Sequence, residues 1–372
     1  MKAAYYPGLD VLRIVASAAV VYTHTRDWFV VGGERWRFDE VFTAAVMGPL
    51  HVDTFLVPLG VTTFFLISGL VITQAAFRER PGRFLFRRAA RTLPAMWAVL
   101  LVVWVVARAG VPIGVTGEVT AGTLFGNLTL TNFFFAGVPG LDLVTWTLVV
   151  QFAFYLFVAA TIPLLRRWPW LPPALSVAVV SVLLSVVHTE SPVALHTLRV
   201  VVTLLPILFI GQVITLVRTG RLHPLAGVAY AVLHWLLIVR GDLTSDFTPA
   251  VPGYTRMVIC IALLAIVFCR MPGDGVAGRW LRGTASRTYA VFLVHVPVLY
   301  VTPHLISTPA GTTLAFLVAM TGTAVIADLL YRLVEAPALR WCRRWENRGQ
   351  STAERAPDDL AGRVEETRQR AR

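Results

Sequence analysis

The feature that most constrains this chain is a series of long apolar runs, each long enough to cross a bilayer. About 20 apolar residues in a helix span the ~30 Å hydrocarbon core of a membrane. Ten such runs follow one another, near 9–29, 54–77, 88–110, 143–165, 171–188, 198–218, 222–239, 254–271, 286–305 and 311–335. The content of 56% hydrophobic and 15% charged residues excludes an ordinary soluble domain. The sequence therefore predicts an all-α fold, a polytopic transmembrane helical bundle of about ten spans.

Arginine is concentrated in alternate connections between these runs. The arginine-rich connections contain Arg78, Arg80, Arg83, Arg87, Arg88, Arg91, Arg166, Arg167, Arg218, Arg221, Arg270, Arg279, Arg282 and Arg287. The intervening connections contain Asp27, Glu34, Asp39, Glu40, Glu118, Asp142, Glu190, Asp242 and Asp246. Because short cytoplasmic loops carry an excess of Lys and Arg, we expect a multi-pass protein of the cell membrane with both termini in the cytoplasm. Topology also explains the net charge of +12, so the charge does not indicate nucleic-acid binding.

The chain divides into one large membrane domain and a short tail. We expect residues 1–345 to form the integral membrane domain, and the charged residues 346–372 to form a cytoplasmic tail that is disordered or helical. The moderately apolar stretch 120–135 is expected to be a surface or re-entrant segment, since an eleventh span there would reverse every later connection.

No metal site is expected. The chain has three cysteines without CxxC spacing, namely Cys260, Cys269 and Cys342. Neither a zinc site nor a disulfide framework follows from them.

A polar stripe runs along the first apolar run. Arg13 and His24 are eleven positions apart, which at 100° per residue leaves them only about 20° apart around a helix. Asp10 and Ser17 fall within about 60° of the same face. Charged groups at membrane depth cost about 2.5–3.5 kcal/mol each, so such a stripe requires partners or a function. One interpretation pairs Arg13 with Asp10 at an interface and leaves His24 as a cap; the other makes His24 a general base with Arg13 positioning the substrate.

A second intramembrane histidine, His295, lies in the ninth run. Phe292 precedes it by three residues and lies within about 60° of its face, and Tyr289 precedes it by six. A hydrogen-bonded histidine in a helix contact and a catalytic histidine are both consistent with this pattern.

Three arginines mark the start of the third run, where Arg87, Arg88 and Arg91 are followed by Pro94. The N-terminus of a helix offers free backbone N–H groups and a positive dipole end, and arginine binds phosphate with two parallel hydrogen bonds. The cluster suits a ligand with several phosphates, such as coenzyme A or a nucleotide. Ordinary anchoring by positive charge on the cytoplasmic side is the alternative.

Together these motifs resemble acyltransferase family 3, whose members transfer acyl groups from coenzyme A thioesters to hydroxyls of sugars and related acceptors. The resemblance covers about 1–340 and runs through six motifs in order. These are Arg13 with His24; Phe64, Phe65, Ser68 and Gly69; Arg87, Arg88, Arg91 and Pro94; Trp146, Thr147, Leu148, Phe154 and Tyr155; Ser286, Tyr289, His295 and Pro297; and Glu335 with Pro337. The resemblance implies that the three arginines bind acyl-CoA, and it adds Ser68, Trp146, Gln151, Tyr155 and Tyr289 as supporting residues.

The chain departs from the family pattern at two positions. Gln151 stands where the family usually has a glutamate, and Thr62 stands where an acid often precedes the Phe-Phe pair. Glutamine cannot act as a base, so any role that depends on that glutamate is absent here.

The leading hypothesis from the sequence is a membrane O-acyltransferase that moves an acyl group, expected to be acetyl, from acyl-CoA to a hydroxyl of a glycan or glycosylated small molecule. Its expected partners are acyl-CoA, such an acceptor and the membrane lipids, with no nucleic acid and no metal. Direct transfer and a two-step route through an acylated group both remain open. The alternatives are a transporter or flippase that uses the polar stripe, and a catalytically silent member of the family.

Overall fold

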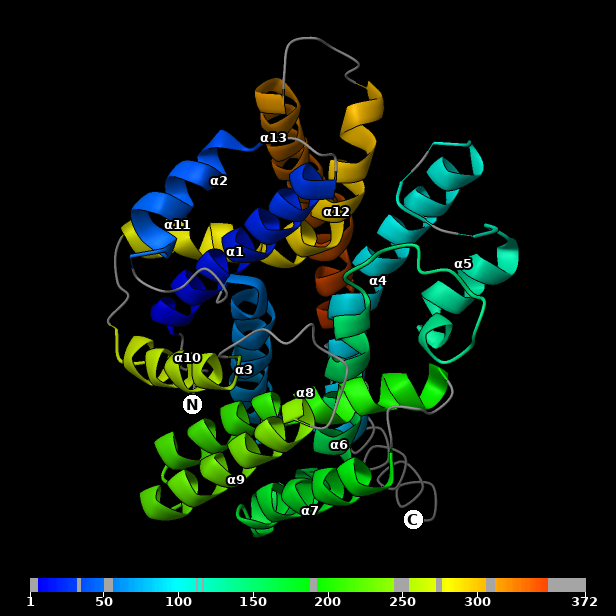
Figure 1. The fold of residues 1–372 in the computed structure, drawn as a ribbon. Coiled ribbons are helices and arrows are strands. Elements are labelled where there is room, and N and C mark those ends of the chain that lie inside the picture. The colour runs from blue at the N-terminus through cyan, green and yellow to red at the C-terminus, as the bar shows by residue number, and fades with distance from the viewer. Residues whose placement is uncertain are drawn as a thin grey trace, which may run out of the picture.

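The computed structural model is a bundle of helices, and no strand occurs in the part of the chain that it describes. That part consists of residues 6–31, 35–49, 56–111, 113–115, 117–187, 193–243, 254–271, 276–305 and 312–346. The elements are α1 (Pro7–Val31), α2 (Arg37–Phe42), η1 (Thr43–Met47), α3 (Leu56–Ala76), α4 (Pro81–Arg108), α5 (Ala121–Leu128), η2 (Thr131–Phe133), α6 (Trp146–Arg167), α7 (Leu171–Val186), α8 (Val193–Arg218), α9 (Pro224–Leu243), α10 (Tyr254–Phe268), α11 (Val276–Ala285), α12 (Thr288–Leu305), α13 (Thr312–Leu330) and η3 (Tyr331–Glu335) (Figure 1).

Ten of these helices coincide in order with the ten apolar runs, so the prediction of an all-α membrane bundle is confirmed. Six helices in the described ranges are long and apolar enough to cross a membrane by length and composition: α3, α4, α6, α8, α9 and the continuous helix that contains α13. Three more, α7, α10 and α12, are apolar but shorter. The tenth is α1, which carries the polar stripe. The stretch 120–135 holds only the eight-residue α5 and a single 3₁₀ turn, which are too short to span a bilayer.

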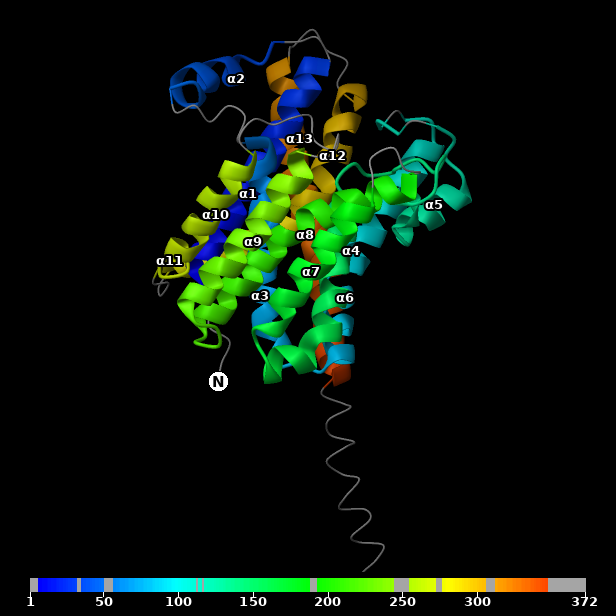
Figure 2. The ribbon, with the colours of Figure 1, turned by 60° about the horizontal axis from the view of Figure 1, so that its bottom comes forward.

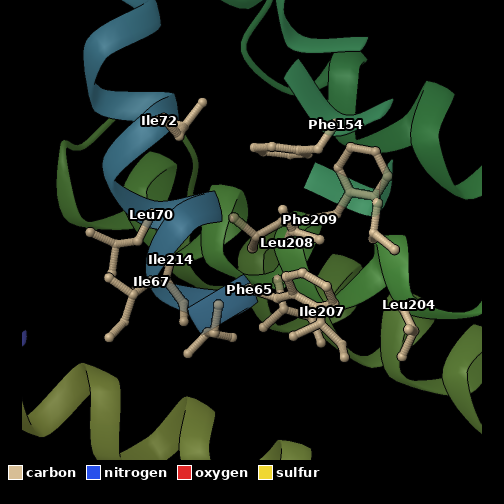
Figure 3. Packing of buried hydrophobic residues seen from close by; sticks show 14 of the residues in the cluster. Phe65, Ile67, Leu70, Ile72, Phe154, Leu204, Ile207, Leu208, Phe209 and Ile214 are labelled. Carbon is tan, nitrogen blue, oxygen red and sulfur yellow. The ribbon is translucent and has the colours of Figure 1, made fainter. Parts of the chain in front are cut away.

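One part of the bundle, which we call the packed sector, consists of α3 and α6–α10. Its centre is α8, which is buried along almost its whole length. Phe65, Leu70 and Phe209 pack there with other apolar side chains from α3, α6 and α8 (Figure 3). Gly69 permits α3 and α8 to approach closely, because a Cβ atom at this position would lie 1.9 Å from the Leu208 carbonyl oxygen. Small residues at such crossings stabilise membrane bundles by close packing.

The other part, which we call the open sector, consists of α1, α4, α12 and α13 with its continuation η3. Its core is smaller, and many side chains of α4 and α13 remain exposed where they face away from the bundle. Figure 1 shows α12 and α13 beside α1, and α4 reaching α6 of the packed sector.

The two ends of the bundle differ in charge. At the end that we call the arginine end, the Arg218 guanidinium lies over the ring of Tyr6, just before α1, and Arg221 lies over the ring of Phe77, just after α3. Arg87 and Glu346 pair at this same end, so the first helix starts and the last described helix ends on one side (Figure 2). The opposite end carries α2 and is called the α2 end. The cytoplasmic location of the arginine end stays a prediction.

Candidate active site

Two histidines from opposite ends of the sequence meet inside the open sector. The ring centroids of His24 on α1 and His295 on α12 are 5.2 Å apart. His24 is partly exposed, whereas His295 is fully buried. The sequence proposed both residues separately, and the packing of α1 against α12 brings them together.

The hydrogen bonds of His295 fix which ring nitrogen can act as a base. Its Nδ1 lies 2.8 Å from the Phe292 carbonyl oxygen and 3.1 Å from that of Val291. Because carbonyl oxygens only accept, Nδ1 carries the proton and Nε2 has the lone pair in the neutral ring. Nε2 is buried and has no hydrogen-bond partner among the described residues. A buried, unpartnered acceptor is costly unless something binds it, so Nε2 is suited to accept a hydrogen bond.

The rest of the polar stripe leads from the histidines toward the arginine end. Arg13 donates to Asp10 over 3.2 Å, as one of the two sequence interpretations expected. Eleven residues at ~1.5 Å per residue place Arg13 about 16 Å from His24 along α1. Ser17 lies between them, is buried, and lines a cavity against α13.

The three arginines of α4 do not have equivalent surroundings. Arg87 donates twice to the Glu346 carboxylate and once to Glu79, each over 2.7 Å. Its guanidinium is thus already neutralised by two acids. Glu346, which the sequence analysis assigned to the tail, belongs to this network, while 347–372 lie outside the described residues.

Arg88 and Arg91 keep more of their hydrogen-bonding capacity. The Arg88 guanidinium lies 5.7 Å from the ring centre of Phe84 and 3.7 Å from Glu79, and its Nε has no described partner. Arg91 is exposed and forms no hydrogen bond or ion pair with any residue that the structure describes. These two arginines are therefore the ones free to bind an anion.

Hydroxyl and amide groups of α3 and α6 lie near the arginines. The Gln151 amide nitrogen donates to Ser68 Oγ over 3.1 Å and to the Tyr155 hydroxyl over 2.6 Å. The Tyr155 hydroxyl lies within electrostatic reach of Arg13, Arg88 and Arg91. Gln151 therefore holds Tyr155 in place by donating a hydrogen bond to its hydroxyl, whereas a carboxylate at this position could only accept one from it.

Two further residues that the family resemblance added, Tyr289 and Trp146, make separate contacts. The Tyr289 hydroxyl donates to the Thr92 carbonyl oxygen on α4 over 2.9 Å, which ties α12 to the arginine-bearing helix. Trp146 begins α6 and packs, partly buried, against the packed sector.

Two buried acids near these residues, Glu335 and Asp142, have no role in the sequence analysis. Glu335 ends the π-helical turn η3, is 5% exposed, and its Oε1 has no described partner, although Arg91 and Tyr289 lie within electrostatic reach. Asp142 lies in the connection before α6, where burial raises the pKa of its carboxyl to about 7. Glu335 could have been found from the sequence, because it matches a family motif together with Pro337. Nothing in the sequence distinguished Asp142 from the other acids that lie between the apolar runs.

Two cavities border this region. One of about 510 Å³ lies between α4, α12 and α13 and is lined almost entirely by aliphatic side chains, including Val99, Val294 and Leu330. The other, of about 540 Å³, lies between α1 and α13. Among the described residues no group of three or more His, Cys, Asp or Glu side chains could hold a metal ion.

A membrane bundle that brings a histidine pair and two available arginines into one sector, with the buried Tyr155 hydroxyl of α6 close to the arginines, has the parts of an intramembrane group-transfer enzyme. A family model described as an acyltransferase domain matches residues 6–332, so the chain belongs to acyltransferase family 3 and is a multi-pass membrane acyltransferase. The chain is also similar to "Nodulation protein 10" of Rhizobium leguminosarum bv. viciae, with 24% identity over 364 residues that cover 89% of this chain and 92% of that protein. No solved structure matches.

Proposed function

We propose that this protein transfers an acyl group, most simply acetyl, from acyl-CoA to a hydroxyl of a glycan or glycosylated small molecule. The observation that carries the proposal is the contact between His24 and His295, with the unpartnered Nε2 of His295 at its centre. Two imidazoles that meet in a membrane interior are expensive to retain for packing alone.

The donor binds at the arginine end. Arg88 and Arg91 have guanidinium groups available for phosphates, and charge-assisted hydrogen bonds of this kind are the strong ones. Arg87 also lies there, but its positive charge is compensated by ion pairs with Glu79 and Glu346. The pantetheine arm of the donor would extend past Tyr155 toward the histidines, which delivers the thioester to the base.

The histidine pair supplies the base. His24 is partly exposed and can reach the acceptor hydroxyl, while Nε2 of His295 can accept the other ring proton of His24 and fix its orientation. The acceptor oxygen attacks the thioester carbonyl carbon as its proton passes to His24. The carbon–sulfur bond breaks, and the CoA thiolate takes the proton, which returns His24 to its neutral form. Direct transfer and a route through an acylated intermediate both satisfy this balance.

The experiment is a transfer assay with the purified protein in lipid nanodiscs, radiolabelled acetyl-CoA and candidate glycan acceptors. Label should appear on an acceptor oxygen in step with the release of free CoA thiol. A transporter or a silent scaffold would leave the thioester intact. Intact thioester with every acceptor, in protein that binds acetyl-CoA, would refute the proposal.

The proposed orientation places the arginine end in the cytoplasm. It rests on the arginines around α4, α6 and α8 at this end, in accord with the positive-inside rule. In a variant without the native cysteines, a cysteine at Ala136, which is exposed between η2 and α6, should react with an impermeant maleimide in intact cells. A cysteine at Gly82 should react only after lysis, and the reverse result would invert the orientation.

A further inference from the structure

The cavity between α1 and α13, which we call the α1–α13 slot, has a chemistry that the acyl-transfer site does not use. Its lining comes mainly from α1 and α13, with further residues from the start of α2, the junction of α11 with α12, and α12. The lining runs over twelve residues of each helix, from Ile14 to Thr25 and from Phe316 to Ala327, and the eleven rises of ~1.5 Å between them correspond to about 16 Å along the bundle. Figure 2 shows α2 near the ends of α1 and α13.

The middle of the slot is apolar and open to the side. Its walls there are Ile14, Val21 and Met320, together with the small residues Ala18 and Ala324, both of which are exposed. In a bilayer this opening faces lipid, so the occupant that enters through it is a hydrocarbon chain.

The α2 end of the slot is aromatic, and an ion pair lies next to it. Trp36 lies 5.3 Å from Phe316 between ring centroids, and Phe38 is 56% exposed. The Tyr22 hydroxyl donates to Asp39, which also pairs with Arg26 over 3.3 Å. Flat aromatic faces beside a carboxylate and a guanidinium are suited to a sugar, because the C–H faces of a pyranose ring stack on aromatic rings while its hydroxyls bond to charged groups.

Two more features connect the slot with the proposed reaction. Ser17, which shares the stripe face of α1 with His24, lines the slot, and so does Val291, whose carbonyl oxygen lies 3.1 Å from Nδ1 of His295, so the slot borders both helices that carry the histidine pair. Thr323 is 4% exposed, and its hydroxyl has no partner among the described residues. By contrast, the cavity between α4, α12 and α13 is almost uniformly aliphatic and offers no binding group for a headgroup.

We propose that the α1–α13 slot is the acceptor site, and that it takes a lipid-linked sugar with its hydrocarbon chain between α1 and α13 and its sugar at the α2 end beside His24. This inference rests on the proposed function and narrows it to one acceptor class. The acceptor enters sideways from the bilayer, while acyl-CoA enters from the arginine end, so the two substrates meet at the histidines from different compartments.

The test uses a polyprenyl-phosphate-linked monosaccharide that carries a diazirine in its chain, added to the full-length protein in nanodiscs. After illumination, mass spectrometry should find the label on peptides that contain 14–25 and 316–327. Excess unlabelled glycolipid should abolish the label, and the same amount of phosphatidylglycerol should not. Equal competition by phosphatidylglycerol would overturn the proposal, because the slot would then hold bulk lipid.

Substitutions in the slot test the acceptor site separately from the acyl-transfer reaction. Ala18→Phe and Ala324→Phe fill the slot and should lower crosslinking at least tenfold while acetyl-CoA binding stays unchanged. Ala160→Phe makes the same change on the exposed face of α6 and should crosslink like the wild type. Unchanged crosslinking in both slot variants would overturn the slot assignment. Specific crosslinking without any acyl transfer would support the slot and refute the transfer reaction.

Discussion

Two buried histidines, one in each sector, show how differently the same side chain is used. In the packed sector, His234 Nδ1 lies 2.7 Å from the Tyr230 carbonyl oxygen and Nε2 lies 2.8 Å from Ser176 Oγ. Both nitrogens are therefore bonded within the fold. In the open sector, His295 makes the equivalent Nδ1 bond to its own helix, but its Nε2 has no described partner and its ring faces His24.

The difference extends to the helices around them. The packed sector is built on α8 and on the close crossing of α3 and α8 at Gly69, which stabilise the bundle. The open sector contains the two cavities described above and the available arginines. Burial alone therefore does not distinguish the two histidines. What distinguishes His295 is a buried nitrogen without a described partner in the sector that holds the cavities, which makes it a candidate for the proposed reaction.

The largest expected effect is on turnover. His24→Gln keeps some hydrogen bonding but removes the basic nitrogen, and general bases contribute about 100- to 10,000-fold. We expect kcat to fall by that factor while acyl-CoA binding persists, as measured by the transfer assay and by equilibrium binding. His234→Gln is the matched control and should lower thermal stability with kcat retained. Near-normal turnover in His24→Gln would shift the base role to His295.

The second largest effect is expected on the affinity for acyl-CoA, and its size should differ among the three arginines of α4. Loss of a charge-assisted hydrogen bond costs about 1.5–3 kcal/mol, or one to two decades in affinity. Arg88→Ala and Arg91→Ala should weaken acyl-CoA binding by that amount in calorimetry. Arg87→Ala should lower affinity less and thermal stability more, because Glu79 and Glu346 lose their partner. If Arg87→Ala has the largest effect on affinity, its acid pairs must break when the donor binds.

The third effect belongs to the packed sector. Gly69→Ala places a methyl group against the Leu208 carbonyl and forces α3 away from α8, and overpacking of this kind costs about 1–3 kcal/mol. We expect a lower midpoint of thermal unfolding in detergent. Gly82→Ala meets no atom within 4 Å and should be neutral. Equal midpoints for the two variants would show that the helix crossing tolerates the added volume.

The smallest effect tests the positioning role of Arg13. Arg13→Lys keeps the charge next to Asp10 but loses the planar fork, and one hydrogen bond is worth about 1 kcal/mol. A loss of about fivefold in kcat/KM is expected from steady-state kinetics, with an unchanged pH profile because the base is elsewhere. A change in the pH profile would instead make Arg13 part of the proton transfer.

Much of the architecture was predictable from the sequence because it depends on local patterns. Apolar runs of bilayer length gave the ten helices, and the angular arithmetic along the first run placed Arg13 and His24 on one face. The ion pair of Asp328 with Arg332 is likewise local, since the two residues are four positions apart on one helix and lie 2.7 Å apart. What the pattern did not contain was the second partner of Asp328, Arg287, which is 41 positions away.

The sequence by itself determined the membrane class, the order of the helices and the chemical inventory, because burial in hydrocarbon and helical periodicity act within each segment. Only the tertiary structure decided which buried groups meet: that His24 faces His295, that Arg87 is neutralised by Glu346 while Arg91 is not, and that a slot separates α1 from α13. Those outcomes depend on how helices distant in the chain pack side by side, and one-dimensional periodicity carries no information on which neighbour a given face will find.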